Sequence, residues 1–273
     1  MGRFSTNRCV AESRLRWVLR DNHAMPVVAH LLHSPVKGLA LVERPSLRIT
    51  SEGAPFDRCF FVVDAQGELA GSWSHGRLCL TRADYDGETL TLHLPDGAVV
   101  SAPDPLPGDE IALVWDSDEP AVGNLVEGPW AAALSDVLGE PVRLARVGPE
   151  RGGWSAFAVS MIGDASIAAL GHGPLDARRF RMGVGLTGGE PFEEDEWIGY
   201  DIAVGSTVLA VREPCARCVA TTRDPATGER DFNALRAMIT ERGAANLGIY
   251  CDVVQPGVIA VGDAVRVLGR SAA

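Results

Sequence analysis

Short apolar or alternating runs, each bounded by Gly, Pro or Asp, dominate the first half of the chain. Such runs predict β-strands, because side chains alternate between the two faces of a strand. Asp86-Gly87 and Asp96-Gly97 lie between such runs and predict tight turns. The predicted strands are residues 27–32, 39–42, 59–64, 89–94 and 111–115. Residues 26–118 are therefore predicted to form an antiparallel sheet or a small barrel.

The second half mixes helices with strands. An alanine-rich stretch at 130–138 follows Pro129 and stops at Gly139, which predicts a short helix. Asp164 is expected to cap a second helix through Leu170, and Asp231 a third that ends at Gly243. Further strands are predicted at 180–186, 207–212, 219–223 and 249–254, followed by a closing hairpin through the turn residues 262–263.

The 273 residues are enough to bury a substantial core. The pattern predicts a mostly β protein with a few helices, of the α+β class. Three parts are expected: a loose N-terminal extension at 1–25, a β-barrel-like module at 26–118, and a second β-rich domain at 119–273.

Composition and charge exclude several classes of function. The net charge of −11 argues against broad binding of nucleic acid, which requires Lys and Arg to neutralise phosphates. Every apolar run is interrupted by charged or turn residues before it could cross a bilayer, so no membrane association is expected. Six cysteines are too few for a disulfide framework in a chain of this length. A reducing, cytoplasmic location is therefore predicted.

Two motifs resemble functional signatures without the required context. Residues 183–188 match the Gly-x-Gly-x-x-Gly string of dinucleotide-binding proteins, but Gly189-Glu190-Pro191 follows where a helix should begin. Residues 193–196 are four consecutive acids, which share no single face of a regular element. We predict that they form a solvated surface turn, with one edge packed beside Trp197.

The run Cys215-Ala216-Arg217-Cys218 has several interpretations. Structural zinc would need two further ligands, and no second Cys-x-x-Cys or nearby His pair supplies them. A thioredoxin-like pair would open a helix, whereas the residues after Cys218 have the pattern of a strand. A reactive thiolate beside Arg217 is a third interpretation, because a cation favours the ionised thiol that ligates soft metals. Two buried cysteines in a strand are the fourth.

Several basic residues are candidates for contacts with an anion. Each of them taken alone is an ordinary surface charge. They are Lys37, Arg58, Arg178, Arg179 and Arg181.

Segments spread along residues 26–269 together resemble a known family. Pro35-Val36-Lys37-Gly38-Leu39 and Phe56-Asp57-Arg58 resemble the N-terminal β-barrel module that precedes MOSC domains. Further segments occur in the order of the MOSC domain itself, which is found in molybdenum cofactor sulfurases and in the mitochondrial amidoxime reducing component. These segments are residues 179–181, 194–197, 214–218, 221–225 and 262–263.

The resemblance implies a pyranopterin molybdenum cofactor held between the two modules. In the amidoxime reductases a cysteine ligates molybdenum, and Cys218 aligns with it. Lys37 and Arg58 align with residues that contact the phosphate and the pterin of the cofactor, and Arg181 aligns with the arginine of the Arg-Phe-Arg motif. By the same resemblance Arg217 and Thr221 are assigned to cofactor binding, and Cys218 to catalysis.

The sequence departs from the family pattern at two positions. Gly38 stands where the family usually has Ser, and Met182-Gly183 stands where it usually has Pro-Asn. A hydroxyl and an amide side chain are therefore missing.

Three functional hypotheses follow. The first is an oxidoreductase that reduces N-hydroxylated or N-oxide small molecules, with electrons from a separate protein of the ferredoxin or flavin type. The second is a carrier that delivers the cofactor, or a sulfur bound as a Cys persulfide, to a partner. The third is a divergent biosynthetic enzyme that uses the same pocket, for which Gly38 and Gly183 are the support.

Overall fold

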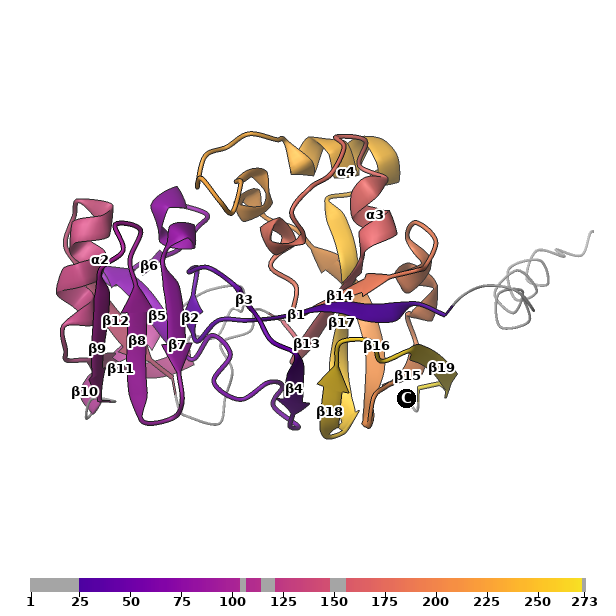
Figure 1. Cartoon of the computed structure of the whole chain (residues 1–273), viewed down its shortest axis with the longest axis horizontal. Coiled ribbons are helices and arrows are strands. Elements are labelled where there is room, and N and C mark those ends of the chain that lie inside the picture. The colour runs from indigo at the N-terminus through magenta and orange to yellow at the C-terminus, as the bar shows by residue number, and fades with distance from the viewer. Residues whose placement is uncertain (1–24, 104–106, 114–120, 148–155, 272–273) are drawn as a thin grey trace, which may run out of the picture.

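The computed structural model of the chain describes residues 25–103, 107–113, 121–147 and 156–271. The predicted N-terminal extension lies outside these ranges except for residue 25, and so does the predicted boundary between residues 118 and 119. Figure 1 shows the described chain as two bodies of sheet side by side, one from the earlier and one from the later elements. The prediction of a mostly β protein with a few helices is confirmed.

The first body contains a six-stranded and a three-stranded sheet around one core. In the six-stranded sheet the order is β10-β11-β12-β5-β2, with β6 paired to β5. Its strands are β2 (Val36–Lys37), β5 (Phe60–Asp64), β6 (Leu69–Ala70), β10 (Pro107–Leu113), β11 (Ala121–Val126) and β12 (Val142–Arg146). The three-stranded meander is β7 (Arg82–Tyr85), β8 (Thr89–His93) and β9 (Val99–Pro103). The two predicted Asp-Gly turns join its strands.

Helix α2 (Trp130–Leu138) closes the core of the first body, as the sequence predicts. Trp130 is fully buried among apolar residues of both sheets, and its indole N–H donates to the carbonyl of Leu90 in β8 at 2.8 Å. The short 3₁₀ helix η1 (Gly76–Leu80) buries Leu78 in the same core. The apolar faces of the sheets and the helix are thereby removed from water.

The second body is built on an eight-stranded sheet, whose strand order is β19-β15-β16-β17-β13-β14-β1-β3. Its strands are β1 (Val27–His33), β3 (Val42–Glu43), β13 (Val159–Gly163), β14 (Val184–Thr187), β15 (Tyr200–Val204), β16 (Thr207–Ala216), β17 (Asn246–Gln255) and β19 (Val265–Arg270). The separate pair of β4 (Ser46–Ile49) and β18 (Gly257–Ala260) packs on the same core.

Strands from the start of the chain therefore belong to the sheet of the second body. Figure 1 shows β1 within the second body, from which the chain runs on into the first. There β1 pairs antiparallel with β14, and the short β3 pairs with β1. The chain then returns to the first body through the loop after β4. This exchange keeps the segments after β1 and β4 at the junction of the two bodies.

Helices decorate the second sheet at one end. They are α3 (Asp164–Ala168), α4 (Ala234–Arg242) and the 3₁₀ helices η2 (Ala177–Phe180), η3 (Glu193–Trp197) and η4 (Val219–Thr222). Phe180, Met238 and Leu247 are fully or almost fully buried in the small core beneath them. None of the helices in the described part of the chain has the length and apolar character of a membrane span.

Several predicted elements have different bounds or a different type. Residues 219–223 were predicted as a strand but form η4, because the hydroxyls of Thr221 and Thr222 donate to the carbonyls of Cys218 and Val219 and hold a tight turn. The third helix begins at Ala234 with Asn233 as its cap. Asp231 cannot cap it, because Arg179 binds both of its carboxylate oxygens.

The predicted strand at 180–186 starts later, at Val184, because Phe180 ends η2 and Arg181 adopts a left-handed backbone. The second helix ends at Ala168, before the predicted Leu170. The predicted strand at 39–42 is reduced to the two residues of β3, Val42–Glu43.

The acidic run and the closing hairpin also differ from the predictions. The run forms η3, and Glu194 is only 2% exposed, with its carboxylate bound by the Ser166 hydroxyl and the Gly163 N–H. The packed edge that the prediction places beside Trp197 is confirmed, but it also includes the carboxylate of Glu194, which was expected to be solvated. Residues 262–263 do form a turn, but β18 pairs with β4 and β19 pairs with β15.

Candidate functional site

A cavity of about 740 Å³ lies between the two bodies. Its walls come from the loops after β1 and β4, the segment between η2 and β14, and the segment from the end of β16 into η4. All six residues that the sequence predicts as site residues line this cavity: Lys37, Arg58, Arg181, Arg217, Cys218 and Thr221. The fold thus brings together positions up to 184 residues apart, while their individual roles stay predictions.

Cys218 presents the only exposed thiol among the described cysteines. It has an extended backbone and directly precedes η4, so the chain turns sharply after it. Cys215, three residues earlier in β16, is fully buried in the core beneath the helices. The two cysteines of the motif therefore occupy different environments, and only Cys218 lies at the cavity surface.

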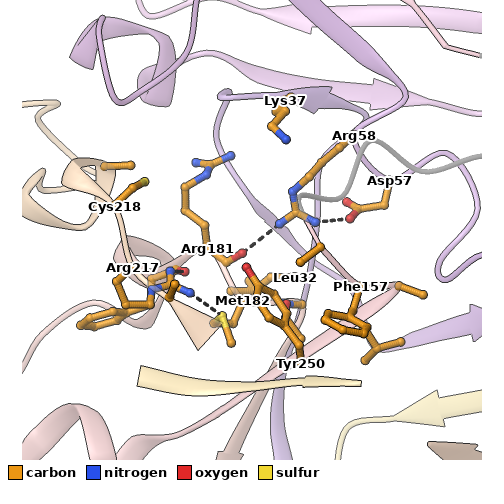
Figure 2. Close-up of a pocket in the computed structure, with 18 of the residues that line it drawn as sticks. Leu32, Lys37, Asp57, Arg58, Phe157, Arg181, Met182, Arg217, Cys218 and Tyr250 are labelled. Atoms are coloured by element: carbon orange, nitrogen blue, oxygen red, sulfur yellow. Dashed lines mark hydrogen bonds and ion pairs between the residues drawn. The ribbon is translucent and has the colours of Figure 1, made fainter. Parts of the chain in front are cut away.

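Arg58 and Arg181 converge on the cavity from the two bodies. Arg58 forms an ion pair with the neighbouring Asp57, and its second guanidinium nitrogen donates to the Arg181 carbonyl at 2.9 Å. The Arg181 guanidinium donates to the Leu39 carbonyl at 2.8 Å. In Figure 2 the Arg181 side chain extends between Cys218 and Arg58, with Lys37 above it.

The environment of Arg181 disfavours its charge. Desolvation, reinforced by repulsion from Arg58, lowers the pKa of the Arg181 guanidinium to about 10, against the weaker opposing effects of Cys79, Asp57 and Cys218. Arg181 still carries its proton at neutral pH. Two guanidinium groups that repel each other in a cavity form a site where an anionic ligand would be stabilised.

The backbone of this basic wall is unusual. Arg58 and Arg181 have φ angles of 54° and 55°, in the left-handed region that non-glycine residues rarely adopt. Such a conformation costs about 1–3 kcal/mol per residue and persists where the surrounding structure fixes it. The bond from Arg58 to the Arg181 carbonyl is one of those restraints.

Lys37 contributes a third cation from the first body. It lies in β2, which pairs in parallel with β5, and the residue is only 9% exposed. Its ammonium is 5.9 Å from the centre of the Phe61 ring. The pairing of β2 with β5 thus fixes the position from which the Lys37 side chain reaches the cavity.

Arg217 and Thr221 line the cavity but bind protein atoms. The Arg217 guanidinium donates to the sulfur of Cys215 at 2.7 Å, to the sulfur of Met182 at 2.9 Å and to the carbonyl of Phe180. The Thr221 hydroxyl donates to the Cys218 carbonyl at 2.9 Å, and the residue is almost fully buried. Both side chains hold the segment that carries Cys218.

The other candidate anion contacts have carboxylate partners. Arg179 is almost fully buried and binds both carboxylate oxygens of Asp231 at 2.8 Å. Arg178 binds Asp176 at the start of η2. Neither arginine is among the residues that line the cavity.

The two glycines that depart from the family pattern differ in their surroundings. Gly38 has a φ of 91°, and a Cβ atom there would lie 2.7 Å from the Gly71 Cα. A side chain, including that of Ser, would collide with this backbone. Gly183 has no such conflict, because its nearest neighbours would be 3.7 Å or more from a Cβ atom. Only Gly38 is therefore required by the local packing.

The opposite end of the cavity is apolar and aromatic. Phe157 and Tyr250 pack with their ring centres 5.7 Å apart, and Leu47, Ile49 and Ala54 lie on the same lining. No motif in the sequence marks these residues as part of a site. Tyr250 lies inside a predicted strand, but a strand pattern does not tell which face borders a cavity. Glu68 and Glu213 also line the cavity, which is therefore not uniformly basic.

The common metal-ligating side chains form no cluster in the described part of the chain. Among the residues that the structure describes, no three side chains of His, Cys, Asp or Glu are placed to hold an ion together.

Comparison with protein families assigns a class to this fold and cavity. Residues 25–136 match the MOSC N-terminal beta barrel domain, and residues 150–266 match the MOSC domain. The chain belongs to the family of proteins in which these two domains follow each other. The resemblance that the sequence motifs predict is confirmed.

Two curated relatives are similar over most of this chain. Mitochondrial amidoxime-reducing component 1 of Xenopus laevis is 26% identical over 90% of this chain and 83% of its own length. Molybdenum cofactor sulfurase of Drosophila grimshawi is 27% identical over 91% of this chain, but the chain spans only 36% of that protein. Among solved structures, the YuaD protein of Bacillus subtilis has 11% identity and a TM-score of 0.44, covering 92% of this chain and 99% of its own.

Proposed function

We propose that the chain binds a pyranopterin molybdenum cofactor in the cavity between the two domains and reduces N-hydroxylated or N-oxide small molecules. The observation that supports this most is the joining of an exposed thiol, Cys218, and three cations, Lys37, Arg58 and Arg181, on one cavity. The name of one relative, a molybdenum cofactor sulfurase, supports the same cofactor, and the name of the other, an amidoxime-reducing component, supports the same class of substrate.

The residues present fit the chemical demands of such a cofactor at its two ends. A thiolate is a soft ligand suited to the metal, and clustered guanidinium and ammonium groups suit a phosphate. The repulsion between Arg58 and Arg181 would be relieved by an anion placed between them. Gly38 lines the cavity, but the space that a side chain would take there is filled by the Gly71 backbone. The amide that the family places at position 183 is absent, so that contact would have to come from elsewhere.

The roles of the residues follow from their positions. Cys218 would ligate the metal, while Lys37, Arg58 and Arg181 would hold the anionic part of the cofactor. Arg217 and Thr221 would fix the Cys218 segment from within the protein. The apolar end, with Phe157 and Tyr250, would contact organic groups and exclude water.

When bound, the cofactor would supply two-electron chemistry that removes oxygen from an N–O bond. Each turnover of an N-hydroxy compound would consume two electrons and two protons and release water. The electrons would come from a separate protein of the ferredoxin or flavin type.

Turnover with an artificial electron donor tests this function. Protein from a host that makes the cofactor is mixed with a reduced viologen dye and an amidoxime, and the amidine product is quantified. We expect the parent to form one amidine for every two electrons that the dye supplies. Protein that contains molybdenum and pterin but reduces neither an amidoxime nor an N-oxide would contradict the proposal. Sulfur released from Cys218 of such protein by a reductant would favour the carrier hypothesis instead.

A further inference from the structure

Arg217 is in an unusual position for a residue next to a functional thiol. Its guanidinium does not extend toward the other cations of the cavity but binds the sulfur atoms of Cys215 and Met182 and the carbonyl of Phe180. Its main-chain N–H donates to the Ala245 carbonyl at 2.9 Å, where β16 ends. Both the backbone and the side chain of Arg217 are therefore held.

The acceptors of the Arg217 guanidinium show which other segment its side chain is bound to. Phe180 and Met182 are the residues immediately before and after Arg181, and both are almost fully buried. Arg181 between them has the left-handed φ of 55°. Arg217 thus binds the two neighbours of a strained residue whose guanidinium faces the cavity.

We infer that Arg217 is a positioning residue that sets the placement of the Arg181 guanidinium relative to the Cys218 thiol. Cys218 follows Arg217 directly in the chain, so one side chain restrains both groups. This inference rests on the proposed function only in taking the basic end of the cavity as the binding site. It gives Arg217 a role through Arg181 and Cys218, in place of the direct cofactor contact that the family resemblance predicts.

The bonding chemistry explains why arginine is used at this position. A planar guanidinium offers five N–H donors in fixed directions and can reach several acceptors at once. Lysine has the same charge but a single nitrogen, which could not reach two sulfur atoms and a carbonyl with the same geometry. Replacement of Arg217 by Lys is therefore expected to keep part of this restraint, and replacement by Met is expected to remove it.

Phosphate binding measures the position of Arg181 without any molybdenum. Inorganic phosphate is titrated calorimetrically into the purified parent, R217K, R217M and R212M. Arg212 is a matched control, since it lies in β16, the strand that leads to Arg217, is exposed and forms an ion pair with Asp252. We expect the phosphate Kd of R217M to rise about tenfold, the order of one misplaced charged hydrogen bond, and that of R217K to rise less. R212M should match the parent.

A second measurement reports on the thiols. The rates of alkylation of Cys218 and Cys215 by iodoacetamide are followed by peptide mass spectrometry. In R217M we expect the buried Cys215 to become reactive and the rate at Cys218 to change at least threefold, with both rates unchanged in R212M. If the parent binds no phosphate, these rates decide the inference alone.

Loss of folding is separated from loss of positioning. Thermal melting identifies variants that do not fold, and M182L serves as the second variant if R217M fails. Leu has nearly the volume of Met but lacks the sulfur acceptor, so M182L should shift the phosphate Kd or the Cys218 rate in the same direction by a smaller factor. Folded R217M and M182L with a phosphate Kd and alkylation rates within twofold of R212M would overturn the inference. The molybdenum content of the parent bears on the proposed function and not on this result.

Discussion

The two ends of the cavity are built in different ways. At the basic end, Arg58 and Arg181 have left-handed backbones and Gly38 has a φ of 91°. At the apolar end, Leu47 and Ile49 lie in β4, Tyr250 lies in β17, and Phe157 precedes β13, all in ordinary backbone conformations. One end is thus carried by irregular, strained segments and the other by regular strands.

This difference indicates which end of the cavity is specialised for ligand binding. Regular strands place apolar side chains on a sheet face without further restraint, as in any core. Strained residues need additional bonds, and here these run between the two domains, from Arg58 to the Arg181 carbonyl and from Arg181 to the Leu39 carbonyl. Strain of this kind clusters at ligand sites. The basic end is therefore where ligand binding should respond most to mutation.

The largest expected effect comes from Cys218. C218S keeps the size of the side chain but replaces a soft ligand with a hard one, so we expect amidoxime reduction to fall at least about 1,000-fold while the melting temperature stays near that of the parent. C215S is the control, because it alters a buried thiol that is bound by Arg217. It should lower the melting temperature but reduce the rate of amidoxime reduction much less than C218S does. Equal activity of C218S and the parent would contradict the assigned role.

The next largest effect distinguishes the two ends directly. R181M removes a cation at the basic end, and we expect the Kd for inorganic phosphate to rise about 30-fold, since hydrogen bonds to charged groups are worth about 1.5–3 kcal/mol. F157L alters the apolar end and should leave that Kd within twofold. Calorimetric titration of both folded variants checks this. A larger change in F157L than in R181M would reverse the assignment of the ends.

The two glycines of the cavity give a stability contrast. We expect G38A to lower the free energy of unfolding by about 3 kcal/mol, because a Cβ atom at φ 91° collides with the Gly71 backbone. G183A has open space and should change it by less than about 1 kcal/mol. Urea unfolding of both variants is the measurement. Equal destabilisation would show that the departure at Gly183 is also imposed by packing.

The smallest effect concerns a carboxylate buried outside the cavity. Burial raises the pKa of Glu194 above its ordinary value, although hydrogen bonds from Ser166 and Gly163 oppose the shift. The folded state then holds the proton more tightly than the unfolded chain. This contribution to stability is fully present below the unfolded pKa of about 4.3 and is lost as pH rises through the folded pKa.

E194Q removes this titration. Relative to the parent, E194Q should therefore be more stable at pH 7 than at pH 4, as measured by urea midpoints across that range. Asp164, whose pKa is also raised by burial, remains in both proteins and cancels in the difference. A difference that does not depend on pH would show that Glu194 does not titrate as described.

Much of the architecture could be predicted from local patterns. Asp-Gly pairs, the Pro129 and Gly139 boundaries of α2, and alternating runs gave correct strands, turns and one exact helix, because these signals act within a few residues. The motif order also indicated which residues line the cavity. Strand exchange between the bodies was not predictable in this way, since the pairing of β1 with β14 joins residues more than 150 positions apart.

The errors have a common physical origin in tertiary contacts. Asp231 has the side chain of a helix cap, but Arg179 binds it from another segment. The residues after Cys218 have the composition of a strand, but the Thr221 hydroxyl turns the chain. Glu194 belongs to a run that composition assigns to solvent, yet Ser166 and Gly163 offer it buried donors. The left-handed backbones of Arg58 and Arg181 leave no mark in the sequence.

The most direct test of the central claim is the molybdenum and pterin content of the purified protein. Parent and C218S are produced in a host that makes the cofactor, molybdenum is measured by elemental analysis, and pterin by fluorescence after oxidation. We predict one molybdenum and one pterin per chain in the parent, with the metal lost or its spectrum changed in C218S. A parent that contains neither would contradict the account, and the cavity would then have to serve a different ligand.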